Sequence, residues 1–275
     1  MGSLALALGG ALWAASFCAA AEGDELDRFD TVVIDPGHGG EDIGALGAGG
    51  LAEKELVLDV SRRLARRLRA SGLNVLLTRN EDVFVPLEMR TSLANDARSD
   101  LFLSVHANSA LDEDPSGVET FFVSLQSSDE EARQVADREN GAFQASGSQV
   151  AVLDPLVGLL GDMMVSEHLT DSSDFSMLVQ DELASIAGGG HRGVKQAPFV
   201  VLLGVQMPAS LIEIGFLSNP RDEKALASDA HREAIAAAMS RAVLRFGKRY
   251  DARRGPGAAL DRGGQEPSVE SLGSR

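Results

Sequence analysis

The stretch FDTVVIDPGHGG, residues 29–40, decides the fold class. Its first part, Phe29–Asp35, is a short run rich in β-branched and apolar side chains, and Pro36 and Gly37 end that run. Such a run followed by glycines is typical of a buried strand that leads into a tight loop. We therefore predict a strand at 29–35 with a glycine-rich loop at its carboxyl end.

Helical and strand patterns alternate after this loop. Apolar residues recur every three or four positions between Glu53 and Ser71, which predicts a helix ended by Gly72. This βαβαβ order predicts an α/β fold with a largely parallel sheet and helices on both faces. The predicted elements that follow are strands at 74–79, 100–105, 117–125, 199–203 and 210–214, and helices at 86–97, 128–140 and around 235–246.

Composition limits the class of protein and its partners. The chain has 275 residues, of which 44% are hydrophobic and 24% charged, as in ordinary globular proteins. Its formal net charge of −16 argues against nucleic acid as a partner, because phosphate binding needs a positive surface. The single cysteine, Cys18, lies in an apolar stretch near the start, so we expect neither disulfides nor thiolate chemistry in the rest of the chain.

The two ends of the chain differ from its middle. The uncharged stretch 3–21 ends in small residues and predicts a signal peptide over 1–21, with an uncleaved membrane anchor as the alternative. Residues 22–250 then form one functional domain, and 251–275, rich in glycine, proline and charge, form a disordered tail. Within the domain, 141–173 fits the alternation poorly, and we interpret it as an insertion.

Two histidines follow predicted strands. His38 comes just after the first strand and His106 just after the third, while Glu53 opens the helix between them. Side chains beyond the carboxyl ends of neighbouring parallel strands converge on one crevice. Two imidazoles and a carboxylate suit zinc and leave a fourth position for water. Because a histidine beside glycines often caps the backbone instead, both interpretations stay open on spacing alone.

A carboxylate lies inside another predicted strand. Glu213 is surrounded by apolar residues in SLIEIGF, where a charge costs several kcal/mol unless it is paired, metal-bound or protonated. One interpretation is a salt bridge to Arg192, and the other is a general base beside a metal.

Other polar residues near these positions have weaker claims. Asp35 is a candidate to orient His38, or else a residue that caps a turn. Asn108 is a candidate to hold the His106 loop or to contact substrate. We expect no ligand role for the remaining histidines, His168, His191 and His231.

At this point the chain resembles a known family, the zinc-dependent N-acetylmuramoyl-L-alanine amidases that cut bacterial cell wall. The resemblance rests on VVIDPGHGGEDIGALG, LAEKELVLDV, LLTRNEDVFVPLEMRTSLAN, LFLSVHAN, GVETFFVS, RGVKQAPFVVL and MPASLIEIGFLSNPRDEKAL. It implies a twisted, mostly parallel six-stranded sheet flanked by helices. It also implies that His38, Glu53 and His106 bind Zn²⁺ and that Glu213 is the catalytic carboxylate. A zinc-activated water would then hydrolyse the amide bond between N-acetylmuramic acid and L-alanine in peptidoglycan.

The members of this family that split daughter cells carry an inserted helix whose glutamate blocks the zinc until an activator protein binds. By position Glu139 resembles that glutamate, and an insertion over about 139–175 would supply the rest; the alternative is an exposed helix carboxylate. The resemblance further implies a monomer that is periplasmic or secreted. Two alternatives remain: a non-catalytic wall-binding or regulatory homologue, and a zinc peptidase acting on the stem peptide.

Overall fold

The predicted first strand forms and lies inside a sheet. In the computed structural model, which describes residues 28–141, 155–186 and 191–254, β1 (Thr31–Pro36) pairs in parallel with β2 (Asn74–Leu77) and β3 (Leu101–Asn108). β3 pairs in parallel with β6 (Ala209–Phe216) on its other side. The carboxyl ends of β1, β3 and β6 therefore share one edge of the sheet.

The remaining two strands complete the sheet in the opposite direction. β4 (Val118–Val123) runs antiparallel to β6, and β5 (His191–Ala197) pairs in parallel with β4. The order β2-β1-β3-β6-β4-β5 confirms the predicted mostly parallel, six-stranded sheet.

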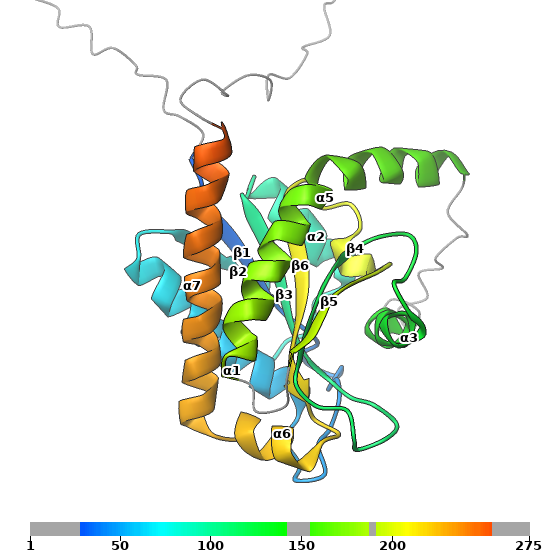
Figure 1. Cartoon of the computed structure of the whole chain (residues 1–275), viewed down its shortest axis with the longest axis vertical. Coiled ribbons are helices and arrows are strands. Elements are labelled where there is room, and N and C mark those ends of the chain that lie inside the picture. The colour runs from blue at the N-terminus through cyan, green and yellow to red at the C-terminus, as the bar shows by residue number, and fades with distance from the viewer. Residues whose placement is uncertain (1–27, 142–154, 187–190, 255–275) are drawn as a thin grey trace, which may run out of the picture. The chain divides into compact units, whose positions relative to one another are not determined.

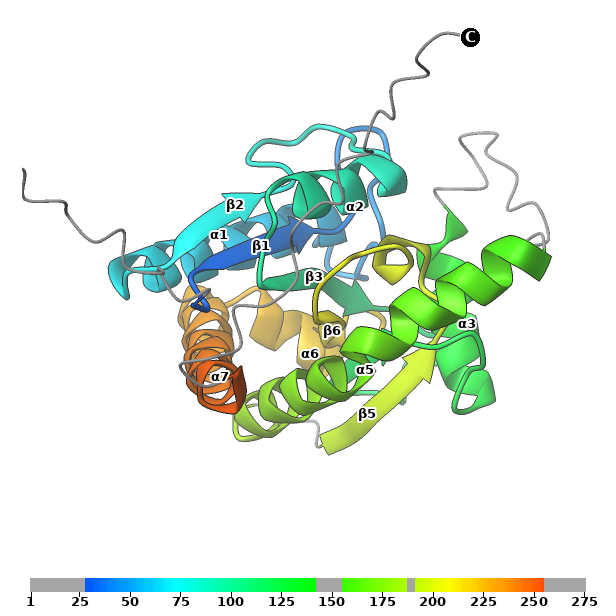
Figure 2. The ribbon, with the colours of Figure 1, turned by 90° about the horizontal axis from the view of Figure 1, so that it is seen from above.

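Helices cover both faces of the sheet. One apolar cluster joins the sheet to α1 (Glu53–Ala70), α5 (Pro155–Ala184) and α7 (Asp229–Arg254). A second cluster on the other face includes residues of α2 (Leu87–Asp96), α3 (Glu130–Glu139) and the short 3-10 helix η1 (Val200–Leu202). Figure 1 shows α7 and α3 on opposite sides of the strands, and Figure 2 shows α2 and α7 in the same relation. The remaining helix, α6 (Pro220–Leu226), connects β6 to α7.

The strand predicted at 199–203 is wrong. This stretch turns through η1, and its apolar side chains fill the second cluster without joining a strand ladder. The strand lies just before it, at β5. The sequence of β5, HRGVKQA, was not predicted as a strand because β5 is an edge strand of the sheet, where Arg192 and Lys195 form ion pairs with carboxylates.

A single long helix occupies much of the segment interpreted as an insertion. α5 starts at Pro155, where proline is tolerated because the first helical N–H has no partner within the helix. It continues past Gly158 and Gly161, and its later part packs Phe175 and Val179 into the first apolar cluster. The insertion over about 139–175 therefore stays a prediction. The end of that segment belongs to a helix that packs in the core.

The segments predicted at the two chain ends lie largely outside the described residues. The expected signal peptide at 1–21 lies there entirely, as do residues 255–275 of the expected tail. α7 extends to Arg254, so the first four residues of that tail are helical instead. Among residues 28–141, 155–186 and 191–254, no helix combines the length and apolar character that crossing a bilayer requires.

Candidate metal centre and active site

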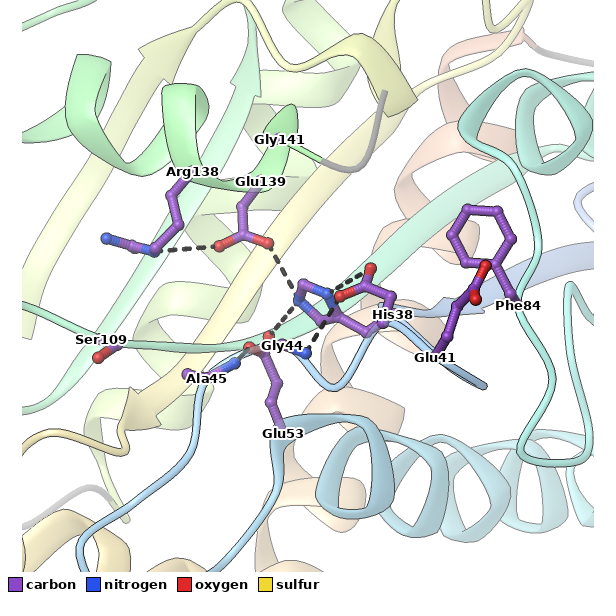
Figure 3. A pocket seen from close by; sticks show the side chains of 11 residues that line it. His38, Glu41, Gly44, Ala45, Glu53, Phe84, Ser109, Arg138, Glu139 and Gly141 are labelled. Carbon is purple, nitrogen blue, oxygen red and sulfur yellow. Dashed lines mark hydrogen bonds and ion pairs between the residues drawn. The ribbon is translucent and has the colours of Figure 1, made fainter. Parts of the chain in front are cut away.

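Four side chains from separate elements meet at the shared edge of β1, β3 and β6: His38, Glu53, His106 and Glu139. Each offers one nitrogen or oxygen, and these four atoms all lie within 4.8 Å of one another. Figure 3 shows Glu53 and Glu139 pointing toward His38 from two sides. The structure thus brings together all four residues that the sequence predicts as metal contacts.

The shortest distances in the cluster run between ring nitrogens and carboxylate oxygens. His38 Nε2 lies 3.1 Å from Glu53 Oε1 and 3.2 Å from Glu139 Oε2. His106 Nδ1 lies 3.2 Å and 2.8 Å from the same two oxygens. The two histidines therefore face the centre with different nitrogens, Nε2 for one and Nδ1 for the other.

The cluster fits a bound divalent cation. His38 Nε2 and Glu139 Oε2 are buried and close together, yet within the described part of the chain neither has a partner in hydrogen-bond geometry. Buried polar atoms that converge without bonding one another are typical of metal ligands. Two imidazoles with carboxylates form a donor set that zinc binds.

Strong opposite charges meet in this buried place. Burial alone would lower the pKa of His106, but Glu139 and Glu53 raise it to about 10. Burial would likewise lower the pKa of His38, but carboxylates, chiefly Glu53, raise it. Burial would raise the pKa of Glu53, yet His38 lowers it to about 2. The two carboxylates thus attract positive charge, which protons or a divalent cation can supply.

Glycines let the ligand-bearing segments approach closely. A Cβ on Gly37 would lie 2.3 Å from Cε1 of His106, so the His106 ring occupies the space of any larger residue there. A Cβ on Gly44 would lie 2.6 Å from Glu53 Oε2. Glu53 itself is fixed by backbone donors, since its carboxylate accepts from the N–H of Ala45 at 2.8 Å and of Ala107 at 2.9 Å.

Asp42, and not Asp35, is the carboxylate beside the His38 ring. Its Oδ2 lies 3.0 Å from His38 Nδ1, the nitrogen that faces away from the cluster. The prediction that Asp35 orients this ring is wrong. Asp35 accepts hydrogen bonds from Thr78, Ser104 and Arg90 instead.

Arg90 connects Asp35 to the His38 loop. This buried guanidinium donates to Asp35 Oδ1 and also to the carbonyl oxygens of Pro36 and His38, each at 2.8 Å. Arg79 donates to the carbonyls of Pro36 and Gly37 at 3.0 and 2.7 Å. The two arginines hold His38 in a left-handed conformation, with φ of 57°. Neither arginine was predicted from the sequence as a site residue.

Glu213 is buried beside the cluster without a partner. It is paired in register with His106 on β3, and it has no exposed surface. Counting described residues only, neither of its carboxylate oxygens has a hydrogen-bond partner. Burial raises its pKa well above the usual value, and the charge of Glu139 raises it further.

The interpretation of Glu213 as a salt-bridge partner of Arg192 is wrong. Arg192 Nε donates instead to Glu119 at 2.7 Å, and its NH2 group donates to Glu131 at 2.8 Å. A protonatable carboxyl group beside a metal-ligand set is suited to accept and donate protons.

A cavity of about 570 Å³ opens onto the cluster. It is lined by His38, Asp42, Glu53, Phe84 and Glu139, among others. A concave site next to convergent polar groups is the usual setting for a substrate.

Two of the other histidines lie outside this cluster. His168 lies on α5 and His231 on α7, and neither belongs to the metal-ligand group found in the described ranges. His191 opens β5, but its side chain lies outside the described residues.

Comparison with known proteins gives a consistent result. A family model described as N-acetylmuramoyl-L-alanine amidase matches residues 32–245. The amidase AmiC of Neisseria meningitidis is 36% identical over 221 residues, which cover 80% of this chain and 53% of that protein. The amidase AmiA of Escherichia coli is 32% identical over 222 residues, covering 80% of this chain and 77% of the relative.

The chain thus spans about half the length of the first relative and about three quarters of the second. Among solved structures, the amidase AmiC2 of Nostoc punctiforme matches with a TM-score of 0.59 and 28% identity. That match covers 80% of this chain and 97% of the other.

Proposed function

Because this chain belongs to the N-acetylmuramoyl-L-alanine amidase family, we propose that it hydrolyses the amide bond between N-acetylmuramic acid and L-alanine in peptidoglycan with a zinc ion. The observation that carries the proposal is the convergence of four ligand atoms within 4.8 Å of one another next to buried Glu213. His38, Glu53 and His106 would hold the ion.

The chain's own residues then divide the remaining tasks. A bound zinc ion would polarise the scissile carbonyl and lower the pKa of a water to roughly 7. Glu213 accepts a proton from the attacking water and passes one to the nitrogen of L-alanine as the C–N bond breaks. The products are a glycan with a free lactyl carboxylate and a stem peptide with a free amino terminus.

Digestion of purified peptidoglycan by the zinc-loaded protein tests this function. We expect lactyl carboxylates and L-alanine amino termini among the products. New termini within the stem peptide would support the peptidase alternative, and binding without cleavage would support a non-catalytic wall-binding or regulatory protein. Zinc content by elemental analysis should fall in His38→Ala.

The base assignment has its own test. Glu213→Gln keeps the size of the side chain but cannot take a proton, so we expect bound zinc and a loss of turnover of roughly 100-fold or more. Glu88→Gln, which removes an exposed carboxylate of α2, serves as the control. Turnover by the Glu213→Gln variant near the parent rate would contradict the assignment.

We also propose that Glu139 holds the enzyme inactive. It occupies the fourth position of the ligand group, where a reacting water or carbonyl would otherwise lie. An activator protein that displaces α3 would remove this carboxylate. Its approach to both histidines supports this proposal, which goes beyond family membership.

Glu139→Ala tests the inhibition. We expect hydrolysis without an activator to rise by roughly 10- to 100-fold, since the variant removes an inhibitory coupling, and such couplings are typically about 1–3 kcal/mol. Glu130→Ala is a matched control, because Glu130 is exposed on the same helix and pairs with Arg133. An unchanged rate in the Glu139→Ala variant, with zinc bound, would contradict inhibition.

The cellular setting is proposed on sequence grounds. The apolar segment 3–21 supports export to the periplasm or the cell exterior, and the family supports a role in separating daughter cells. We propose that the protein acts as a monomer. A fusion of residues 1–30 to a reporter tests export directly.

A further inference from the structure

Asn108 occupies a special place at the end of β3. Its side chain is buried, with 1% of the residue exposed. The pairing of β3 with β6 shifts register between His106 and Asn108, and the Asn108 carbonyl accepts from the N–H of Leu217 at 2.7 Å. Such irregularities re-aim side chains next to active sites.

The neighbours of Asn108 fix which way its amide points. Nδ2 donates to Glu119 Oε2 at 3.0 Å, and Oδ1 accepts from the NH2 group of Arg138 at 2.6 Å. An ionised carboxylate can only accept and a guanidinium can only donate. The other oxygen of Glu119 forms ion pairs with Arg192 and Lys195, at 2.7 and 3.2 Å. The Asn108 oxygen must therefore face α3.

This amide lies close to the catalytic carboxylate. β6 runs between β3 and β4, so the hydrogen bond from Asn108 to Glu119 crosses over β6. Glu213 of β6 is paired in register with His106 on one side and Glu119 on the other. Residues paired in register lie side by side on one face of the sheet. The Asn108 oxygen is thus a buried acceptor in the neighbourhood of Glu213.

Two consecutive residues of α3 cover this region. Glu139 contacts the metal-ligand group, and Arg138 supplies the donor that Asn108 needs. When α3 is displaced, the Asn108 oxygen loses its donor, and a buried acceptor without a partner is unfavourable. A substrate that takes the place of α3 can supply an N–H group as the new donor.

We infer that Asn108 Oδ1 accepts a hydrogen bond from the N–H of the scissile amide, so that Arg138 occupies a substrate position in the inhibited enzyme. This inference rests on the proposed function. In the reaction the C–N bond breaks, a water oxygen bonds the carbonyl carbon, and the nitrogen receives a proton from Glu213. Asn108 exchanges no proton. It orients the nitrogen and favours amides over esters.

A pair of substrates tests this contact. One is a muramoyl peptide with the normal amide, and the other is an ester analogue in which oxygen replaces the scissile N–H. The parent protein is the full chain carrying Arg138→Ala and Glu139→Ala, which removes both contacts of α3. Adding Asn108→Ala should lower kcat/KM about 10- to 100-fold for the amide. For the ester the change should stay within about threefold, because no N–H is present to be bound.

A second variant leaves Asn108 in place. In Glu119→Gln, Arg192 and Lys195 retain the carbonyl oxygen of the new amide, so its NH2 group faces Asn108. Asn108 then has to turn its own oxygen toward residue 119 and present NH2 to the substrate. We expect the same selective loss for the amide, with zinc content and circular dichroism as in the parent.

The possible outcomes separate the inference from the function on which it rests. Equal losses for amide and ester in both variants would overturn the role of Asn108 and leave the amidase function standing. A zinc-loaded parent that hydrolyses neither substrate would overturn both. Selective loss for the amide in either variant supports the inference.

Discussion

His38 is fixed at its ring and at its backbone by different residues. Asp42 lies beside Nδ1. When its carboxylate accepts a hydrogen bond from Nδ1–H, the lone pair of Nε2 is directed at the cluster. Arg90 and Arg79 hold the carbonyls of the loop in which His38 adopts a positive φ. A ligand prepared in this way needs little rearrangement when a metal binds.

Asp42→Ala should therefore weaken zinc binding by roughly 10- to 100-fold, as is usual when the partner of a ligating histidine is lost. Competition with a chromophoric chelator measures the affinity. Glu41→Ala is the control, since it removes an exposed carboxylate one residue away. Equal weakening of zinc binding by the two variants would show that the affinity depends on net charge alone.

Asp35 supports the loop through Arg90, and its effect depends on pH. Burial would raise the pKa of Asp35, but the Arg90 guanidinium and the hydroxyls of Thr78 and Ser104 lower it below the usual value of 3.8. A lowered pKa means that the charged form stabilises the fold above about pH 4 and that this contribution is lost as pH falls further.

Asp35→Asn should lower the free energy of unfolding at pH 7 by about 3–5 kcal/mol, because Arg90 loses its buried partner. The difference from the parent should stay constant down to about pH 4 and narrow below it. Urea unfolding of both proteins at pH 7, 5 and 3.5 checks this. A difference that already shrinks between pH 7 and 5 would contradict a lowered pKa.

The sequence predicted the residues that meet in the cluster but not the residues that support them. His38 and His106 could be paired because both come at the ends of parallel strands, and Glu53 because it opens the next helix. Asp42 could not be preferred over Asp35, since the choice depends on the turn in which Gly39 and Asp42 exchange backbone hydrogen bonds. That turn follows from positive φ values at residues 38–40, and the distant Arg79 and Arg90 hold the carbonyls of Gly37 and His38 where it begins.

At the scale of elements, α3 presents one continuous buried stripe. Ala132, Val135 and Ala136 pack into the second apolar cluster, and Glu139 follows at the next position of the same helical face. This spacing is a signal for the burial of Glu139 that is independent of family resemblance. Polar contacts hold the first turn, where Glu131 reaches Arg192 and Lys195 at 2.8 and 3.0 Å.

Packing should hold α3 more strongly than these ion pairs. Val135→Ala removes two buried carbons, about 1.6 kcal/mol at about 0.8 kcal/mol per carbon, and should increase opening of α3 roughly 15-fold. Glu131 is exposed, and an exposed ion pair contributes about 0–1 kcal/mol, so Glu131→Gln should increase opening by about fivefold at most. Hydrogen exchange of α3 amides measures both. A larger effect of Glu131→Gln than of Val135→Ala would reverse the ranking.

The same physical reasons explain which elements the sequence predicted. α1 was predicted almost to the residue because Leu56, Val60, Leu64 and similar residues form a periodic buried face. β5 was missed because its stability comes from pairing with β4 and from ion pairs, which leave no alternation of apolar residues. α5 was missed because Gly158 and Gly161 weaken the helical pattern, although packing of its second half sustains the helix.

Over the whole molecule, the ligand group connects parts of the chain that lie far apart in sequence. Its members come from the loop after β1, the start of α1, β3 and the end of α3. In the unfolded chain these residues do not form a common site. A metal that binds the folded state alone therefore stabilises the whole fold and couples α3 to the sheet.

Removal of the metal should thus lower the melting temperature. At a free zinc concentration about 1,000 times Kd, binding contributes about 4 kcal/mol, which corresponds to roughly 8–16 °C for a domain of this size. Differential scanning fluorimetry with zinc and with a chelator measures the shift. His38→Ala should abolish it, whereas Glu139→Ala should keep most of it because three ligands remain. Elemental analysis shows whether zinc has been stripped. If the melting temperature stayed the same without zinc, the four residues would not share an ion in the folded protein.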